Sequence, residues 1–147
     1  MKMRWMAFAV LALGSTACSQ TRVMQSDAAS AVAPQMAVER FLQAANARDL
    51  HGMGQIFGTV DGPLMERQRR QDVELRMDAI SSILKHDDYR IIREEMVAGR
   101  DDPTTRVMVN MTINGRSVDN VPFVVVRANS GRWLVQEVDL ERVMAGG

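Results

Sequence analysis

The stretch Val121–Leu140 constrains the fold more than any other part of the chain. It reads VPFVVVRANSGRWLVQEVDL, with β-branched and aromatic residues on both sides of a turn at Asn129–Gly131. Such residues favour pleated, largely buried strands, and Asn, Ser and Gly favour the turn between them. We therefore predict two strands, Val121–Ala128 and Arg132–Leu140, which need a second layer of structure to cover them.

The first 17 residues have the three zones of a secretory signal peptide. Lys2 and Arg4 precede an apolar run from Trp5 to Leu13, and small residues follow as far as Ala17. As a helix, this apolar run would be about 14 Å long, too short to cross an apolar membrane core of about 30 Å. We expect residues 1–17 to direct export of the chain.

Cys18 is the only cysteine and follows these small residues directly. The run Ser15–Cys18 resembles the lipobox of bacterial lipoproteins, which prefers Leu where Ser15 stands. The resemblance implies that the Cys18 thiol receives a diacylglycerol, and two or more acyl chains anchor a protein stably. Ser19 stands where Asp would imply retention in the inner membrane, so the implied location is the outer membrane, facing the periplasm. The alternative is an unmodified cysteine in a soluble secreted protein.

Residues 18–33 have the composition of a flexible tether, and residues 34–147 that of one domain. Pro34 suits the first turn of a helix. Apolar residues follow at the spacing of one helical stripe; they are Val38, Phe41, Leu42 and Ala45.

Two more helices are predicted before the strands begin. Asp49 can cap a short helix in which Gly52 and Gly54 each cost about 1 kcal/mol relative to Ala. A short strand is possible at Phe57–Val60, and a third helix is expected from about Leu64 to Lys85.

The third predicted helix carries acid-before-base pairs at i, i+4, Glu66–Arg70 and Asp72–Arg76. Such pairs are typical of a solvated helix face. We therefore interpret the basic run Arg67–Arg70 as a solvated surface, with contact to anionic lipid as the alternative.

From Tyr89 onward the pattern is extended. Strands are predicted at Tyr89–Val97 and Thr105–Ile113, and Asn114–Gly115 is a strong signal for a two-residue hairpin. Since Pro122 cannot donate a ladder hydrogen bond, a β-bulge is expected between Asp119 and Pro122. Pairing outward from the turn predicts three pairs, which are Met111–Val118, Val109–Asn120 and Val107–Pro122.

Helices followed by an antiparallel meander predict an α+β domain with helices on one face of a four-stranded sheet. The segments Ala37–Leu50 and Gly131–Val135 resemble the opening helix and the last strand of nuclear transport factor 2-like (cystatin-like cone) domains. The resemblance covers about residues 34–143 and is greatest for small bacterial lipoproteins of unknown function. It implies a curved, mainly antiparallel sheet of four, or five to six, strands that encloses a pocket with the helices.

The enzymes of this family place polar groups in that pocket, so the resemblance directs attention to residues expected there. The candidate pocket residues are Phe41, Phe57, Met77, Tyr89, Phe123, Trp133, Glu137 and Asp139. We expect alternate residues of the predicted strand Arg132–Leu140 to lie on one of its faces; they are Trp133, Val135, Glu137 and Asp139. An acid on an inward face could act in general acid–base catalysis, but solvated acids are more common.

The slightly acidic net charge and the absence of several known motifs argue against some classes of function. Without Lys2 and Arg4 the chain has 16 basic against 18 acidic residues, which disfavours nucleic-acid binding. The sequence has no phosphate-binding loop, nucleophile elbow or metal-ligand spacing, so we expect no cofactor and no metal.

The sequence therefore favours a non-catalytic, lipid-anchored domain that binds a small apolar ligand or an envelope protein. The first alternative is a pocket enzyme of the isomerase or dehydratase kind, with Tyr89 acting beside Glu137 or Asp139. The second alternative is a structural module that forms a homodimer through the open sheet face.

Overall fold

The structure is a computed structural model that describes residues 33–146. The predicted signal peptide, Cys18 and nearly all of the predicted tether lie outside the described residues. The elements in chain order are α1 (Pro34–Ala47), α2 (Leu50–Ile56), β1 (Gly58–Thr59), β2 (Gly62–Pro63), α3 (Leu64–Arg67), α4 (Arg70–Leu84), β3 (Asp88–Met96), β4 (Thr104–Ile113), β5 (Arg116–Arg127), β6 (Trp133–Val138) and α5 (Leu140–Ala145).

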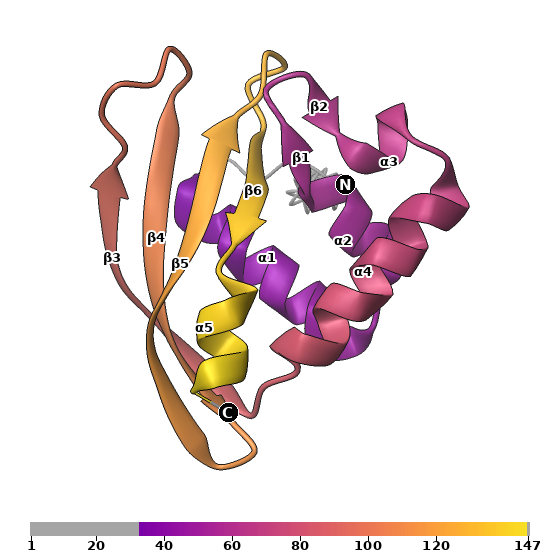
Figure 1. Cartoon of the computed structure of the whole chain (residues 1–147). Helices are drawn as coiled ribbons and strands as arrows, with labels where there is room; N and C mark the ends of the chain where they lie inside the picture. Colours follow the sequence, from indigo (N-terminus) through magenta and orange to yellow (C-terminus); the bar gives the residue numbers. More distant parts are fainter. Residues whose placement is uncertain (1–32, 147) are drawn as a thin grey trace, which may run out of the picture.

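The main sheet is an antiparallel meander in the order β3-β4-β5-β6 (Figure 1). The predicted α+β class and its four antiparallel strands are therefore confirmed. The two further strands, β1 and β2, do not extend this sheet but form a small sheet of their own. A single parallel bridge from Phe57 to Val135 connects this region to the edge of β6.

Helix α1 supplies one side of the core. Pro34 occupies its first turn and Arg48 ends it in the left-handed conformation. The predicted stripe is buried, and the Asp49 side chain accepts a hydrogen bond from the Gly52 amide at 2.9 Å, as expected for the cap of α2. Both helix predictions are confirmed.

The predicted third helix is wrong as one element, because the chain is extended at Gln68 and Arg69. Leu64 and Val73 are both buried on the core side. Nine residues of continuous helix would turn about 900° and place these two side chains on opposite faces. The break between α3 and α4 lets both of them reach the core.

The break also changes the charge pairs. Glu66 lies 3.1 Å from Arg132 instead of pairing with Arg70, and Arg70 pairs with Glu74 at 2.6 Å. Asp72 pairs with the preceding Arg69, at 2.9 Å. The two predicted i, i+4 pairs are therefore wrong, although the Arg67–Arg70 run is exposed as expected.

The predicted hairpin and bulge are confirmed. Asn114 and Gly115 both have positive φ, of 50° and 75°. The register shifts at Asp119–Asn120, so the predicted pair Met111–Val118 forms. The two pairs predicted beyond the bulge are wrong by one residue, and the observed pairs are Val109–Val121 and Val107–Phe123.

One hydrophobic cluster fills the space between the helices and the sheet. It contains residues from α1, α2, α4 and the inner face of β4, β5 and β6. The Phe41 and Phe57 rings belong to this cluster, with centroids 5.7 Å apart. Within residues 33–146, no helix combines the length and apolar character needed to cross a membrane.

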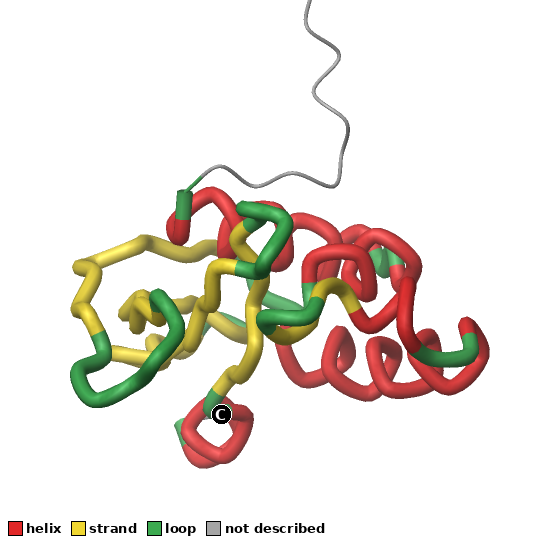
Figure 2. The backbone as a smooth tube through the Cα atoms, turned by 90° about the horizontal axis from the view of Figure 1, so that it is seen from above, coloured by secondary structure: helices red, strands yellow, loops and turns green. Residues whose placement is uncertain are grey.

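Helix α5 contacts both α4 and β5, and its Val143 is buried in the cluster. Seen from above, α5 lies on the other side of the strands from α1 (Figure 2). It therefore borders the sheet face that α1 leaves uncovered, which we call the outer face.

Candidate functional site

Four of the eight candidate pocket residues are part of the packed core. Phe41, Met77 and Phe123 are fully buried and Phe57 is only 6% exposed. All four belong to the same cluster, so their side chains fill the interior that the resemblance led us to expect as a pocket. Trp133 is half-buried and packs against this cluster from the start of β6.

Tyr89 lies at the beginning of β3, beside α1. Its ring meets the His86 ring edge-on, with centroids 5.3 Å apart. Burial, followed by the nearby Glu39 carboxylate, raises the pKa of Tyr89 above its usual value of 10.0. A hydrogen bond with the Gln43 side chain acts in the opposite direction.

Glu137 lies on the outer face, which differs from the prediction. A second bulge at Gln136 makes Val135 pair with Val125 and Glu137 pair with Val124. Val135 is buried in the core, whereas Glu137 is exposed. Trp133 and Val135 share the core face as predicted, but Glu137 does not, because one extra residue reverses the alternation of side chains after Val135.

Asp139 is not in the strand, since β6 ends at Val138 and Leu140 begins α5. Its side chain accepts a hydrogen bond from the Arg142 amide at 2.9 Å and so caps that helix. The predicted extension of the last strand to Leu140 is wrong.

Tyr89 and the two acids are not brought together. Tyr89 is on β3, at one edge of the sheet, and Glu137 is on β6, at the other. Neighbouring strands are about 4.8 Å apart, so three spacings separate these strands by about 14 Å. The acid–tyrosine pair that the enzyme alternative requires is absent from this arrangement.

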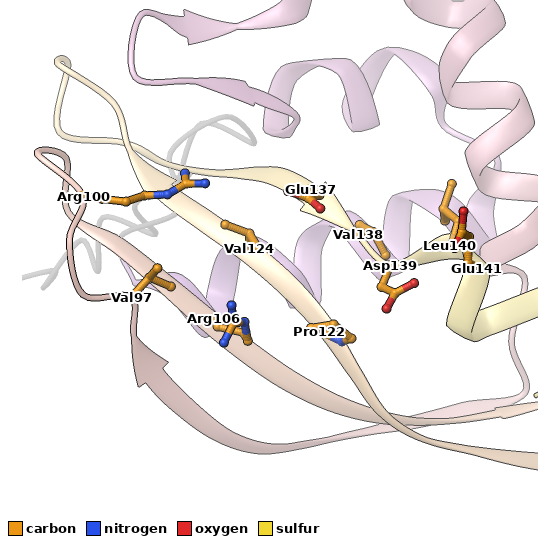
Figure 3. Close-up of a pocket in the computed structure, with 10 residues that line it drawn as sticks. All are labelled: Val97, Arg100, Arg106, Pro122, Val124, Glu137, Val138, Asp139, Leu140 and Glu141. Atoms are coloured by element: carbon orange, nitrogen blue, oxygen red, sulfur yellow. The ribbon is translucent and has the colours of Figure 1, made fainter.

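A groove of about 540 Å³ lies on the outer face and is the clearest candidate site (Figure 3). Its floor includes one cross-strand row, in which Arg106 of β4 pairs with Val124 of β5, and Val124 pairs with Glu137 of β6. Pro122 extends this floor along β5, and Asp139 and Glu141 lie at the end where α5 begins.

The loop between β3 and β4 forms the wall of the groove opposite Asp139 and Glu141. Gly99 turns this loop with a φ of 77°, a conformation that glycine adopts without strain. Arg100 then donates a hydrogen bond from Nη1 to Oε1 of Gln136, at 2.9 Å, although Gln136 is on the far edge strand. The loop therefore reaches across the outer face and gives the groove its depth.

The groove has a basic side and an acidic side. Arg100 and Arg106 line one side, and Glu137, Asp139 and Glu141 line the other (Figure 3). Apolar side chains, including Val124 and Pro122, lie between them. Such an arrangement can bind opposite charges on one ligand and bury an apolar part between them.

Sequence reasoning singled out two acids of this groove, Glu137 and Asp139, but neither Glu141 nor the two arginines. Arg106 could have been found, because it alternates with the buried Val107 in β4 and must point outward. Arg100 could not have been placed, because its position depends on the path of the β3–β4 loop.

No group of three or more His, Cys, Asp or Glu side chains within residues 33–146 is arranged to hold a metal ion. No protein-family model matches this chain, and no curated protein shows significant sequence similarity to it.

Proposed function

We propose that this protein is a lipid-anchored bacterial envelope protein whose domain docks a partner protein without catalysing a reaction. In this proposal Cys18 carries the lipid, residues 19–33 are the tether, and the domain is a nuclear transport factor 2-like cone. Helices that precede a four-stranded antiparallel meander support that fold assignment. The resembling segments Ala37–Leu50 and Gly131–Val135 coincide with α1 and the start of β6.

The main support for a docking role is that the groove lies on the outer face. The interior is occupied by core side chains, whereas charged and apolar groups face each other in a concavity on the outer face. Polar contacts around an apolar centre are typical of protein interaction sites. We therefore assign binding to the surface rather than to an internal cavity for a small apolar ligand.

The lipid anchor can be tested in cells by labelling with a palmitate analogue. The full-length protein should be labelled and recovered with the membrane fraction, because acyl chains contribute about 0.8 kcal/mol per buried CH₂. The Cys18→Ala variant should lose both properties. Equal labelling of the variant would refute the anchor.

Docking can be tested by placing a photo-crosslinking amino acid at Val124 in the groove and, as a control, at Leu75. Leu75 is 74% exposed on α4, away from the outer face. We expect a discrete adduct at Val124 that Arg106→Glu diminishes, and no such adduct at Leu75. Identical products at both positions would contradict the assignment, and an adduct of twice the chain mass would indicate a homodimer instead.

A further inference from the structure

We propose that the outer-face groove binds a short extended peptide segment that carries a carboxylate at one end and an amine at the other. The carboxylate would lie beside Arg106 and the amine beside Glu137. This inference rests on the proposed docking function and specifies the chemistry of the docked segment.

The cross-strand row sets the length of the segment. Arg106 and Glu137 are two strand spacings apart through Val124, which corresponds to about 10 Å between their Cα atoms. An extended chain rises about 3.3 Å per residue. Three to four residues therefore place their terminal charges over the two ends of the row, with apolar residues over Val124.

The size of the groove agrees with this length. Its volume of about 540 Å³ lies within the range of about 300–1,000 Å³ typical of pockets for small ligands. It therefore suits a short segment of a partner rather than a folded element. Pro122 and Val124, both partly exposed, offer apolar surface to the middle of that segment.

The arginines of the groove are incompletely neutralised. Arg106 lies 3.9 Å from Glu95, which is held more closely by Arg93, at 2.6 Å. Arg100 donates to the neutral amide of Gln136. Both guanidinium groups can therefore attract a ligand carboxylate.

The acids at the other end are similarly available. Glu137 and Glu141 form no ion pair with any residue in the range 33–146. Arg106 and Glu137 are about 10 Å apart across a solvated surface, so these two opposite charges attract each other only weakly. The charged side chains at the two ends of the groove therefore remain available to pair with charged groups of a ligand.

The shape of the groove favours a peptide over a second copy of this chain. A two-fold axis would bring the same surface of both copies together, so the two concavities would face each other and leave a gap. Charged residues are also depleted at the centre of stable interfaces between proteins. An inserted segment fills the concavity and meets both charges.

The test uses the intact chain, labelled with ¹⁵N in nonionic detergent, and three peptides with blocked ends. The first peptide has glutamate, two valines and lysine, and the other two replace both charged residues with lysine or with glutamate. We expect saturable amide shifts at Val124 and Glu137, with the mixed-charge peptide binding most tightly.

Single charge reversals should change this preference. Arg106→Glu should weaken binding of the mixed peptide by about threefold to tenfold and favour the peptide with two lysines. Glu137→Lys should favour the peptide with two glutamates. Arg116→Glu is the matched control, because this exposed arginine is eight residues from Val124 on β5, about 27 Å away, and should change nothing.

Two results would overturn the inference. One is the absence of saturable shifts in the groove, or an unchanged peptide preference in both variants. The other is a shift at Val124 that depends on protein concentration alone and disappears in Arg106→Glu, which would assign the groove to a second copy. A cross-linked partner other than a second copy at Val124, together with the first result, would retain the docking function and reject only this ligand chemistry.

Discussion

Tyr89 combines an apolar ring contact with a charged neighbour on α1. Its ring packs against His86 and the core cluster, while Glu39 lies near enough to oppose ionisation of its hydroxyl. Burial is the larger cause of its raised pKa, and Glu39 is the next. The residue therefore reports on the packing of β3 against α1.

Titration of Tyr89 can be followed directly, because the chain contains one tyrosine. The ultraviolet absorbance of tyrosinate should give a midpoint above pH 10.0 in the folded protein. Glu39→Gln should lower this midpoint, since a negative neighbour is removed, and Gln43→Ala should raise it.

The raised pKa also makes stability depend on pH. Well below pH 10 Tyr89 is protonated in both states, so it adds no pH dependence there. Above pH 10 the unfolded chain loses this proton first, so the free energy of unfolding should fall as pH rises. A midpoint at or below pH 10.0 in the folded protein would contradict both expectations.

Among the helices and strands, α2 shows how packing overrides propensity. Gly54 weakens an isolated helix relative to Ala, yet it lies where α2 approaches α4. A Cβ at this position would stand 2.7 Å from both Met65 Cε and Val73 Cγ1. The glycine therefore permits a close contact that a larger residue would force apart.

Gly54→Ala should destabilise the protein, although Ala gains about 1 kcal/mol of helix propensity. Overpacking costs typically about 1–3 kcal/mol, so a net loss is expected in urea unfolding. Met65→Ala in the same background should recover part of this loss because it removes one of the two clashing groups. A more stable Gly54→Ala variant would show that α2 and α4 separate freely.

The sequence predicts the bulge of β5 but gives no signal for the bulge of β6. The bulge at Asp119–Asn120 was expected because Pro122 interrupts the ladder, and Asn120 accommodates it with a φ of 55°. The bulge at Gln136 has no comparable residue in the sequence. It changes the face to which Glu137 points, and with it the composition of the outer-face groove.

In the molecule as a whole, one core connects α1 near the start of the described residues with α5 near their end. The cluster extends from Ala37 to Val143. This continuity is the physical basis for treating the domain as a single folding unit.

Removal of residues 1–32 should leave the free energy of unfolding unchanged within about 0.5 kcal/mol. Ala33 must be retained, because its carbonyl accepts the Ala37 amide at the start of α1, at 3.1 Å. Urea unfolding of the full-length and shortened chains, both in the same detergent, tests this. A large loss of stability would mean that the removed segment packs against the domain.

The sequence by itself determined the first two helices, the four-stranded meander, the Asn114–Gly115 turn and the bulge before Pro122. These features depend on local periodicity and on backbone preferences of Gly, Asn and Pro, which act over a few residues. Even the face of α1 that enters the core follows from the spacing of its apolar residues.

Only the tertiary structure decided where the charged side chains of the candidate site meet. The break between α3 and α4, the reversal at Gln136 and the path of Arg100 over the sheet each satisfy contacts between residues far apart in the chain. Such contacts are not encoded in any short window. For that reason the family resemblance led us to expect an internal pocket with Tyr89, Glu137 and Asp139, whereas the fold packs Phe41, Phe57, Met77 and Phe123 into the core and places the two acids in a groove outside.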